Sequence, residues 1–167
     1  MKYLSIILII LGLVLASCTS KKPTHKPDTV VLNEVFNLIN QARAEARLCG
    51  TKSFLAVPKL SYNNLLAKSA QNHSVDMNNT DVLSHLSPAN SKYYSAGTTA
   101  IQRIQQEGYQ PILIAENIAH KQLTAKELVA DWLASPSHCA SIMNSTITET
   151  GLGHSGTYWT QDFAKPQ

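Results

Sequence analysis

One glutamate in an apolar segment stands out among the residues of this chain that could do chemistry. Glu116 lies in the segment Ile112–His120, and if this segment is a strand, Glu116 shares a face with Ile112, Ile114 and Ile118. A carboxylate on an apolar face needs a partner or a raised pKa. Glu116 is therefore either a functional group or a buried structural one, and the residues alone leave both readings open.

Five of the six histidines follow residue 28, and two of these occupy positions typical of a site. His85 lies in a polar loop, and His138 begins a short helix after a Ser-Pro-Ser run. His73 lies on the apolar face of a helix and is expected to be structural. His120 and His154, at strand ends, are expected at the surface. No two histidines have a metal-binding spacing such as HExxH, so spacing by itself is weak evidence for a metal.

A nucleophile has less support than a general base. The chain has no GxSxG motif, and Cys139 beside His138 is not a nucleophile–base pair, because adjacent side chains do not form one by themselves. A hydrolase would use His85 or His138 as general base with Glu116 orienting it, and a metal-bound water would attack. Ser135 or Ser137 as nucleophile is a poorer variant of this mechanism.

The N-terminal segment predicts export. Met1–Leu15 has one Lys and then an apolar run of about thirteen residues, the length of a signal peptide and too short to span a bilayer comfortably. The following Leu-Ala-Ser-Cys resembles a bacterial lipobox, which would acylate Cys18. An uncleaved anchor or an ordinary secretory cut remains open. The predicted division is a signal peptide (1–17), a lipidated Cys with a flexible tether (18–28), and one domain (29–167).

Cysteine use agrees with export. With Cys18 assigned to the lipid, Cys49 and Cys139 remain as an even pair in an oxidising compartment. A disulfide between them or two separate thiols are both compatible with this count.

Composition excludes several classes of protein. The chain of 167 residues is 44% hydrophobic and 15% charged, unlike disordered, collagen-like or coiled-coil sequences. Its net charge is only +3 and its basic residues are scattered, so no nucleic-acid partner is expected.

Periodicity predicts helices first and strands mostly last, which is an α+β layered domain. Ser61 is the expected N-cap of the second helix, and Thr124 with Glu127 has the pattern of a capping box. The helices are expected at Thr29–Arg47, Ser61–Asn78, 98–107, 124–134 and 138–143. The strands are expected at Pro111–Ala119, Thr150–Ser155 and Thr157–Ala164.

Seven strings in order resemble the CAP superfamily, also called the SCP-like or pathogenesis-related-1 domain, in its short bacterial form. They are NLINQARA, AQNHSVDM, SHLSP, AENIA, WLASPSHCASIMN, TETGLG and YWTQDFA, and their order and spacing match that family across about residues 31–164. The resemblance implies a three-layer α-β-α sandwich, with a small antiparallel sheet between helices and a large cleft. It also implies a Cys49–Cys139 disulfide.

In that family the cleft carries two His and two Glu, which can bind a divalent metal such as zinc. The matching residues here are His85, Glu116 and His138, while the position of the second Glu holds Ser135. Two imidazoles, one carboxylate and a water can still form an open zinc site, with weaker affinity expected.

The resemblance does not fix the function, because the family includes many binding proteins and few enzymes. The first hypothesis is a non-enzymatic, envelope-anchored binding protein with a lipid, sterol, glycan or protein ligand. A metal-assisted or His/Glu-dependent hydrolase is the alternative, and a structural role is the third. The lipobox predicts a lipid anchor in the bacterial cell envelope, in the outer membrane if the organism is Gram-negative.

Overall fold

The computed structural model describes residues 29–167. The predicted signal peptide, the lipidation site Cys18 and the tether lie outside the described residues. None of the helices in residues 29–167 is both long and apolar enough to cross a bilayer.

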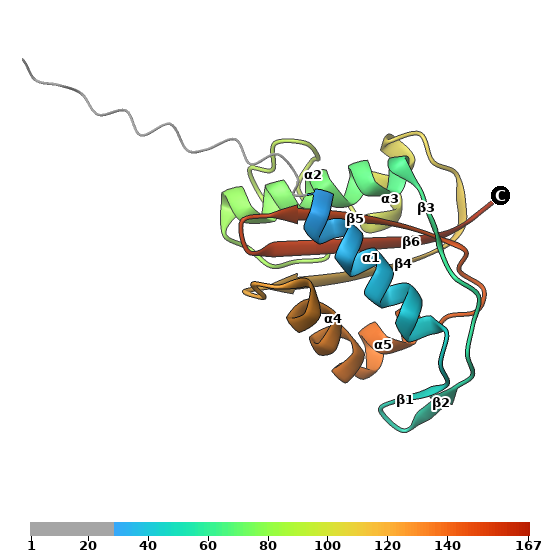
Figure 1. The fold of residues 1–167 in the computed structure, drawn as a ribbon. Helices are drawn as coiled ribbons and strands as arrows, with labels where there is room; N and C mark the ends of the chain where they lie inside the picture. The colour runs from blue at the N-terminus through green and yellow to red at the C-terminus, as the bar shows by residue number, and fades with distance from the viewer. Residues whose placement is uncertain (1–28) are drawn as a thin grey trace, which may run out of the picture.

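A four-stranded sheet lies between two layers of helices (Figure 1). Its strand order is β3-β5-β6-β4, and the pairs of β6 with β4 and with β5 are antiparallel. The short β3 pairs with β5 in parallel, so the expected antiparallel sheet has one parallel edge strand. The strands are β3 (Ser61–Tyr62), β4 (Pro111–His120), β5 (Glu149–Ser155) and β6 (Tyr158–Pro166).

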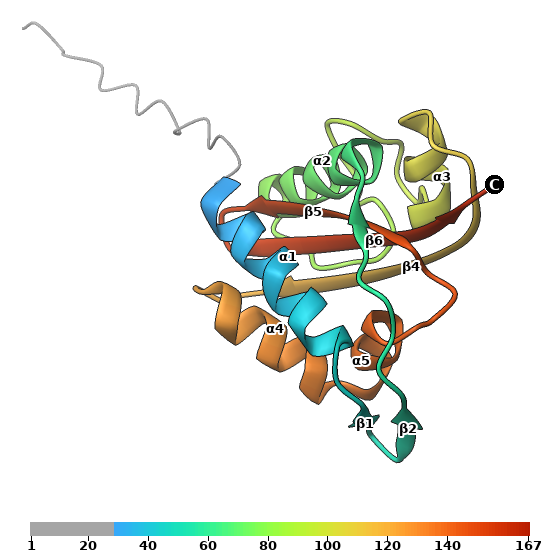
Figure 2. The ribbon, with the colours of Figure 1, turned by 45° about the vertical axis from the view of Figure 1, so that its right-hand side comes forward.

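One face of the sheet is covered by α1, α4 and α5, and the main apolar core lies there (Figure 2). Trp132, Trp159 and Phe163 are its largest buried side chains. A two-stranded hairpin, β1–β2, follows α1 and packs on α5. We call this half the α1–α4–α5 side. Its elements are α1 (Thr29–Arg43), β1 (Arg47–Cys49), β2 (Lys52–Phe54), α4 (Ala125–Ala134) and α5 (Pro136–Ile142).

The other face, the α2–α3 side, is covered by α2 (Asn64–Thr80) and α3 (Ala100–Gln106). Glycines let α2 lie directly on β5. A Cβ at Gly151 or Gly153 would overlap the α2 backbone at Ala67 or Ala70. The TETGLG string therefore has a packing role in this domain.

Most of the predicted elements are present, with differences at their ends. The Thr124–Glu127 capping box of α4 is confirmed, as is the Cys49–Cys139 disulfide, which joins β1 to α5. The N-cap of α2 is Asn63, not Ser61, because Ser61 and Tyr62 pair with β5 as strand β3. The first helix ends at Arg43 rather than Arg47 because the chain turns there and continues into β1.

Candidate functional site

Glu116 lies in the middle of β4 and faces the α2–α3 side. Its neighbours on that face, Ile114 and Ile118, pack into two small apolar clusters with α2 side chains. The predicted shared face is thus confirmed for these two, whereas Ile112 is exposed beyond a register shift between Pro111 and Leu113. The Glu116 side chain is only 4% exposed, so its charge depends on protein donors.

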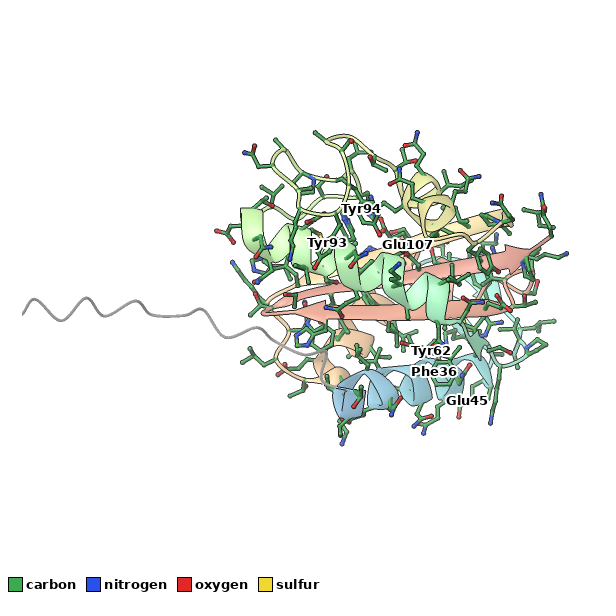
Figure 3. The ribbon with its side chains drawn as sticks, turned by 90° about the horizontal axis from the view of Figure 1, so that it is seen from above. Phe36, Glu45, Tyr62, Tyr93, Tyr94 and Glu107 are labelled. Atoms are coloured by element: carbon green, nitrogen blue, oxygen red, sulfur yellow. A yellow bond between two sulfur atoms is a disulfide. The ribbon has the colours of Figure 1, made fainter. Side chains whose placement is uncertain are left out.

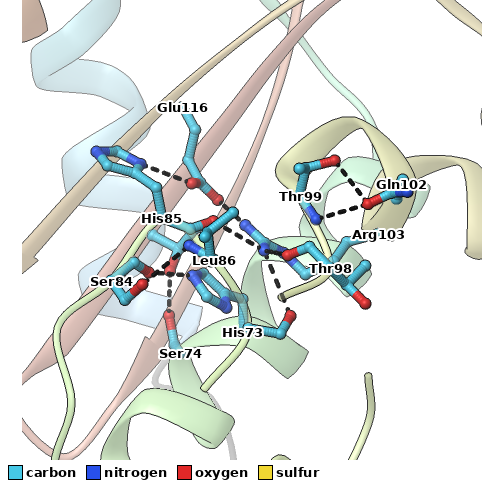
Figure 4. A network of polar contacts seen from close by, with 12 residues as sticks. His73, Ser74, Ser84, His85, Leu86, Thr98, Thr99, Gln102, Arg103 and Glu116 are labelled. Atoms are coloured by element: carbon cyan, nitrogen blue, oxygen red, sulfur yellow. Dashed lines mark hydrogen bonds and ion pairs between the residues drawn. The ribbon is translucent and has the colours of Figure 1, made fainter. Parts of the chain in front are cut away.

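Two donors meet the Glu116 carboxylate, one on each oxygen (Figure 4). The Nδ1 of His85 lies 2.8 Å from Oε1, and the Nη2 of Arg103 lies 2.5 Å from Oε2. Arg103 is fully buried in α3 and also donates to the carbonyls of His85 and Thr98, at 3.0 and 2.9 Å. The guanidinium thereby fixes both the carboxylate and the backbone of the loop that presents His85.

These contacts set the charges of the site. Burial acting alone would raise the pKa of Glu116, but the His85 hydrogen bond and the Arg103 charge lower it below its ordinary value. The same hydrogen bond raises the pKa of His85. Since an ionised carboxylate only accepts, His85 donates through Nδ1, and its Nε2 is left for another partner.

Two buried side chains of α2 hold the loop of residues 81–99. His73 has its Nε2 2.8 Å from the carbonyl oxygen of Ser84, so this nitrogen carries the proton and donates. Burial lowers the pKa of His73 to about 4, which keeps its ring neutral. Asp76 accepts from the amides of Lys92 and Tyr93. The expectation that His73 is a buried structural residue is confirmed.

The loop is also tied to α3 and α2 through Tyr94. Its hydroxyl donates to Glu107 at 2.8 Å, and Asn72 donates to the same carboxylate at 3.0 Å. Tyr93 and Tyr94 lie over α2 with Glu107 beside them (Figure 3).

Asp162 is a second buried carboxyl group next to the site. It lies opposite Glu116 in the β4–β6 ladder and is fully buried. Burial and the nearby Glu116 charge raise the pKa of Asp162 well above its usual range. Asp162 is accordingly the neutral member of the pair, and Glu116 carries the charge.

His138 comes from the other side of the sheet. It lies in α5, which is held by the disulfide through Cys139 and by the Asn117 amide, which donates to the His138 carbonyl at 3.3 Å. Burial, and after it the charge of His85, lower the pKa of His138. The two histidines are thus close enough to interact electrostatically, although they belong to different layers.

The predicted site residues are only partly in mutual contact. Among residues 29–167, no three or more His, Cys, Asp or Glu side chains form a group that could hold a metal ion. His85 and Glu116 are bonded to each other, and both Glu116 oxygens have a donor. Ser135, at the position of the family's second Glu, is the N-cap residue of α5, with its Oγ 3.3 Å from that of Ser137.

His120 and His154 were expected at the surface, and both are half-buried. Each stacks on an aromatic ring of β6, His120 on Tyr158 and His154 on Trp159. Both are therefore packed against the end of the β5–β6 hairpin.

Sequence reasoning missed Arg103 and Asp162. The signal for Arg103 was its place beside Ile104 on the inward face of a short helix, where a charge needs a partner. Asp162 gave a weaker signal, a carboxyl directly before the apolar Phe163 and Ala164 at the end of the YWTQDFA string.

The comparisons with known proteins agree with this architecture. Residues 36–163 match the family model CAP, the cysteine-rich secretory protein family. The chain belongs to the CAP family.

Two Bacillus subtilis proteins are similar. YkwD is 32% identical to this chain over 106 residues, which are 62% of this chain and 38% of YkwD. The membrane protein YlbC is 29% identical over a region that covers 92% of this chain and 40% of YlbC. The CAP chain spans about two fifths of the length of these curated relatives.

Solved structures share the CAP fold. An extracellular SCP-domain protein of Bacillus anthracis has a TM-score of 0.68 at 25% identity, covering 82% of this chain and 41% of that one. An outer surface protein of Borrelia burgdorferi has a TM-score of 0.70 at 22% identity, covering 86% of this chain and 98% of that one. The predicted three-layer α+β fold is confirmed.

Proposed function

We propose that this CAP domain is a non-enzymatic binding protein of the bacterial envelope whose His/Glu site holds a divalent metal ion, with zinc as the first candidate. The observation that supports the proposal is the hydrogen bond between His85 Nδ1 and a Glu116 carboxylate anchored by Arg103. A carboxylate on one ring nitrogen fixes the tautomer and raises the basicity of the other, as in many metal-binding histidines.

The donor set fits a metal held by two histidines. His85 keeps Nε2 for a ligand, and the lowered pKa of His138 favours its neutral, metal-binding form. Glu116 has both oxygens occupied, so its part would be to orient His85. A bound zinc would supply a Lewis acid. With Ser135 in place of a second Glu, we expect weaker affinity than at a site with three protein ligands.

Zinc titration of the metal-stripped domain (residues 29–167) by calorimetry tests this proposal. We expect saturable binding that is lost in the double variant His85→Ala, His138→Ala. His120→Ala, which removes a half-buried histidine stacked on Tyr158, is the matched control and should bind as the parent does. The proposal fails if zinc does not bind, or if the double variant binds as well as the control.

The envelope location rests on the N-terminal segment and on the relatives. Similar proteins are named as extracellular, outer surface or membrane proteins. We propose that Cys18 anchors the domain through lipid, in the outer membrane if the organism is Gram-negative. Cys18→Ser should then move the protein from the membrane to the soluble fraction, and membrane retention of this variant would contradict the anchor.

A lipid is one ligand class that a specific observation favours. A hollow of about 340 Å³ lies between α1 and α4, and its walls include Leu38, Val129 and Leu133. Arg47 and Lys126 at its margin could bind a carboxylate headgroup. A fluorescent fatty acid should bind the parent, and Leu133→Glu, at a half-buried wall residue, should weaken its binding. Equal binding by both proteins would exclude this hollow as the lipid-binding site.

The alternative function is a hydrolase, and the pairing of His85 with Glu116 favours it. The carboxylate would keep His85 as a general base that takes a proton from water at Nε2. Chromogenic ester and casein hydrolysis, compared between the parent and Glu116→Gln, tests this reading. Activity that falls by about two orders of magnitude in the variant would support an enzyme.

A further inference from the structure

Helix α1 presents a row of side-chain amides on its outer surface. Asn33, Asn37 and Gln41 follow one another at intervals of four residues, so they lie on one face and span about 12 Å of helix axis. All three are exposed, and none bonds to another side chain within residues 29–167. These amides are therefore free to hydrogen-bond to a ligand.

Two hollows flank this row where α1 faces the segment from Lys59 to Gln71. The first, about 470 Å³, is lined by α1 residues around Asn37 and by Lys59 and Leu60. The second, about 430 Å³, lies between the start of α1 and α2, with Asn33 in its wall and Leu152 of β5 among its lining residues. We refer to these two hollows together as the α1 groove.

An aromatic pair stands between the two hollows. Phe36 lines the first hollow and Tyr62 the second, and their rings meet edge to face with centroids 5.5 Å apart. Viewed from above, the pair lies between α1 and α2 (Figure 3). Tyr62 is 42% exposed, so part of a flat ring is open to a ligand.

The groove carries little charge. Its charged lining residues are Lys59 and Lys68, and Lys68 is already paired with Glu107 at 2.7 Å. The remaining polar groups are amides and hydroxyls. Such a surface suits an uncharged ligand that both donates and accepts hydrogen bonds, and it does not suit an anionic membrane or a strongly charged peptide.

We propose that the α1 groove binds a linear oligosaccharide that carries N-acetyl groups. Each amide offers two N–H donors and one oxygen acceptor. Sugar hydroxyls need both functions, and an acetamido group matches an Asn or Gln side chain with its own N–H and C=O. The aromatic pair supplies rigid apolar area for the C–H face of a sugar ring. Two hollows in series along one helix fit a chain of rings rather than a single sugar.

This ligand site is separate from the His/Glu site. Tyr62 lies on β3 and Glu116 on β4, the two opposite edge strands of the sheet. Loss of one site therefore need not affect the other, and the two proposals can fail independently.

Calorimetric titration of the full chain with tetra-N-acetylchitotetraose, in a detergent without a sugar headgroup, tests the inference. We expect saturable binding that weakens about tenfold or more in the triple variant Asn33→Ala, Asn37→Ala, Gln41→Ala. Alanine is the best helix former, so α1 is retained, which circular dichroism checks. Cellotetraose, which lacks acetamido groups, should bind the parent more weakly.

Two variants serve as controls and should bind within about twofold of the parent. Gln105→Ala with Gln106→Ala removes two exposed amides from α3. The double variant His85→Ala, His138→Ala removes the histidines of the other site. The inference is overturned if the tetrasaccharide does not bind, if the triple variant binds as the parent does, if the histidine variant loses binding equally, or if cellotetraose binds equally well.

Discussion

The two buried arginines of this domain, one on each side of the sheet, have different kinds of hydrogen-bond partner. Arg43 ends α1 and is buried on the α1–α4–α5 side, where it has only backbone carbonyls as partners. Arg103 is equally buried on the α2–α3 side, but one of its N–H groups goes to a carboxylate, Glu116. The carbonyls that accept from Arg43 belong to Pro58, Ile142, Asn144 and Ile147.

Arg43 therefore stabilises the fold, whereas Arg103 positions the candidate site. Burial lowers the pKa of Arg43 to about 10, which leaves it charged at neutral pH, and its bonds join α1 to the chain around α5. Arg103 contacts Glu116, which can be protonated and is hydrogen-bonded to the titratable His85. Asp162, which can also titrate, lies opposite Glu116. The contacts of Arg103 should therefore respond to pH, and the contacts of Arg43 should not.

Arg103→Met should have the largest effect. It leaves the Glu116 carboxylate buried without its cationic partner, and we expect a loss of about 3–5 kcal/mol in the free energy of unfolding at pH 7. Without Arg103, burial raises the pKa of Glu116, so the folded variant takes up a proton as pH falls. The loss should consequently be smaller at pH 4 than at pH 7.

Urea denaturation at both pH values measures this effect. The control is Arg47→Met, because Arg47 is half-buried and donates only to the Ala42 carbonyl. Its loss should be below about 1 kcal/mol. An Arg103 effect that is the same at pH 4 and pH 7 would mean that the ion pair does not determine it.

Arg43→Met should have the next largest effect. We expect a loss of about 3 kcal/mol in the free energy of unfolding, because four carbonyls lose a charged donor. No carboxylate is involved, so the loss should be equal at pH 4 and pH 7. The same urea experiment measures it. A marked pH dependence would remove the proposed distinction between the two arginines.

His73→Gln should change the pH profile rather than the stability at neutral pH. The folded pKa of His73 is about 4 against about 6.5 when unfolded, so the unfolded chain binds more protons between these values. His73 therefore contributes stability above pH 6.5 that is lost as pH falls, about 2 kcal/mol between pH 7.5 and pH 5.

Glutamine keeps a donor for the Ser84 carbonyl and does not titrate. Urea denaturation over this range should show the parent losing about 2 kcal/mol of unfolding free energy relative to the variant between pH 7.5 and pH 5, which makes the variant the more stable protein at pH 5. A constant difference would show that His73 is protonated in the folded domain.

The sequence predicted those elements whose signals are local. The Thr124–Glu127 capping box depends on a few neighbouring residues and is found where expected. The last two strands, expected at Thr150–Ser155 and Thr157–Ala164, are found within two residues of those bounds. The start of α2 was misplaced because Ser61 and Asn63 are both good N-caps. The choice between them is made by pairing with Glu149 and Thr150, which are distant in sequence.

The candidate site shows the same limit. The strand pattern predicted which face Glu116 points to, and the family strings identified His85 and His138. Neither predicted the Arg103 partner, because that contact depends on how α3 packs on β4. The position of Asp162 opposite Glu116 depends on the β4–β6 register, which a single strand pattern does not determine.

Asp162→Asn should stabilise the domain at pH 7. The raised pKa keeps Asp162 protonated in the folded domain, whereas the unfolded chain ionises it above pH 4, so its contribution to stability falls as pH rises. Asparagine has the same shape, a donor in place of the carboxyl proton and no ionisation. We expect the stability of the variant relative to the parent to rise steadily between pH 4 and pH 7.

The exposed Glu34→Gln on α1 is the matched control and should leave stability unchanged at both pH values. If Asp162→Asn instead destabilises the domain at pH 7, Asp162 is an anion in the folded state. Arg103 would then balance two buried carboxylates, and the charge on Glu116 that orients His85 would be shared between them.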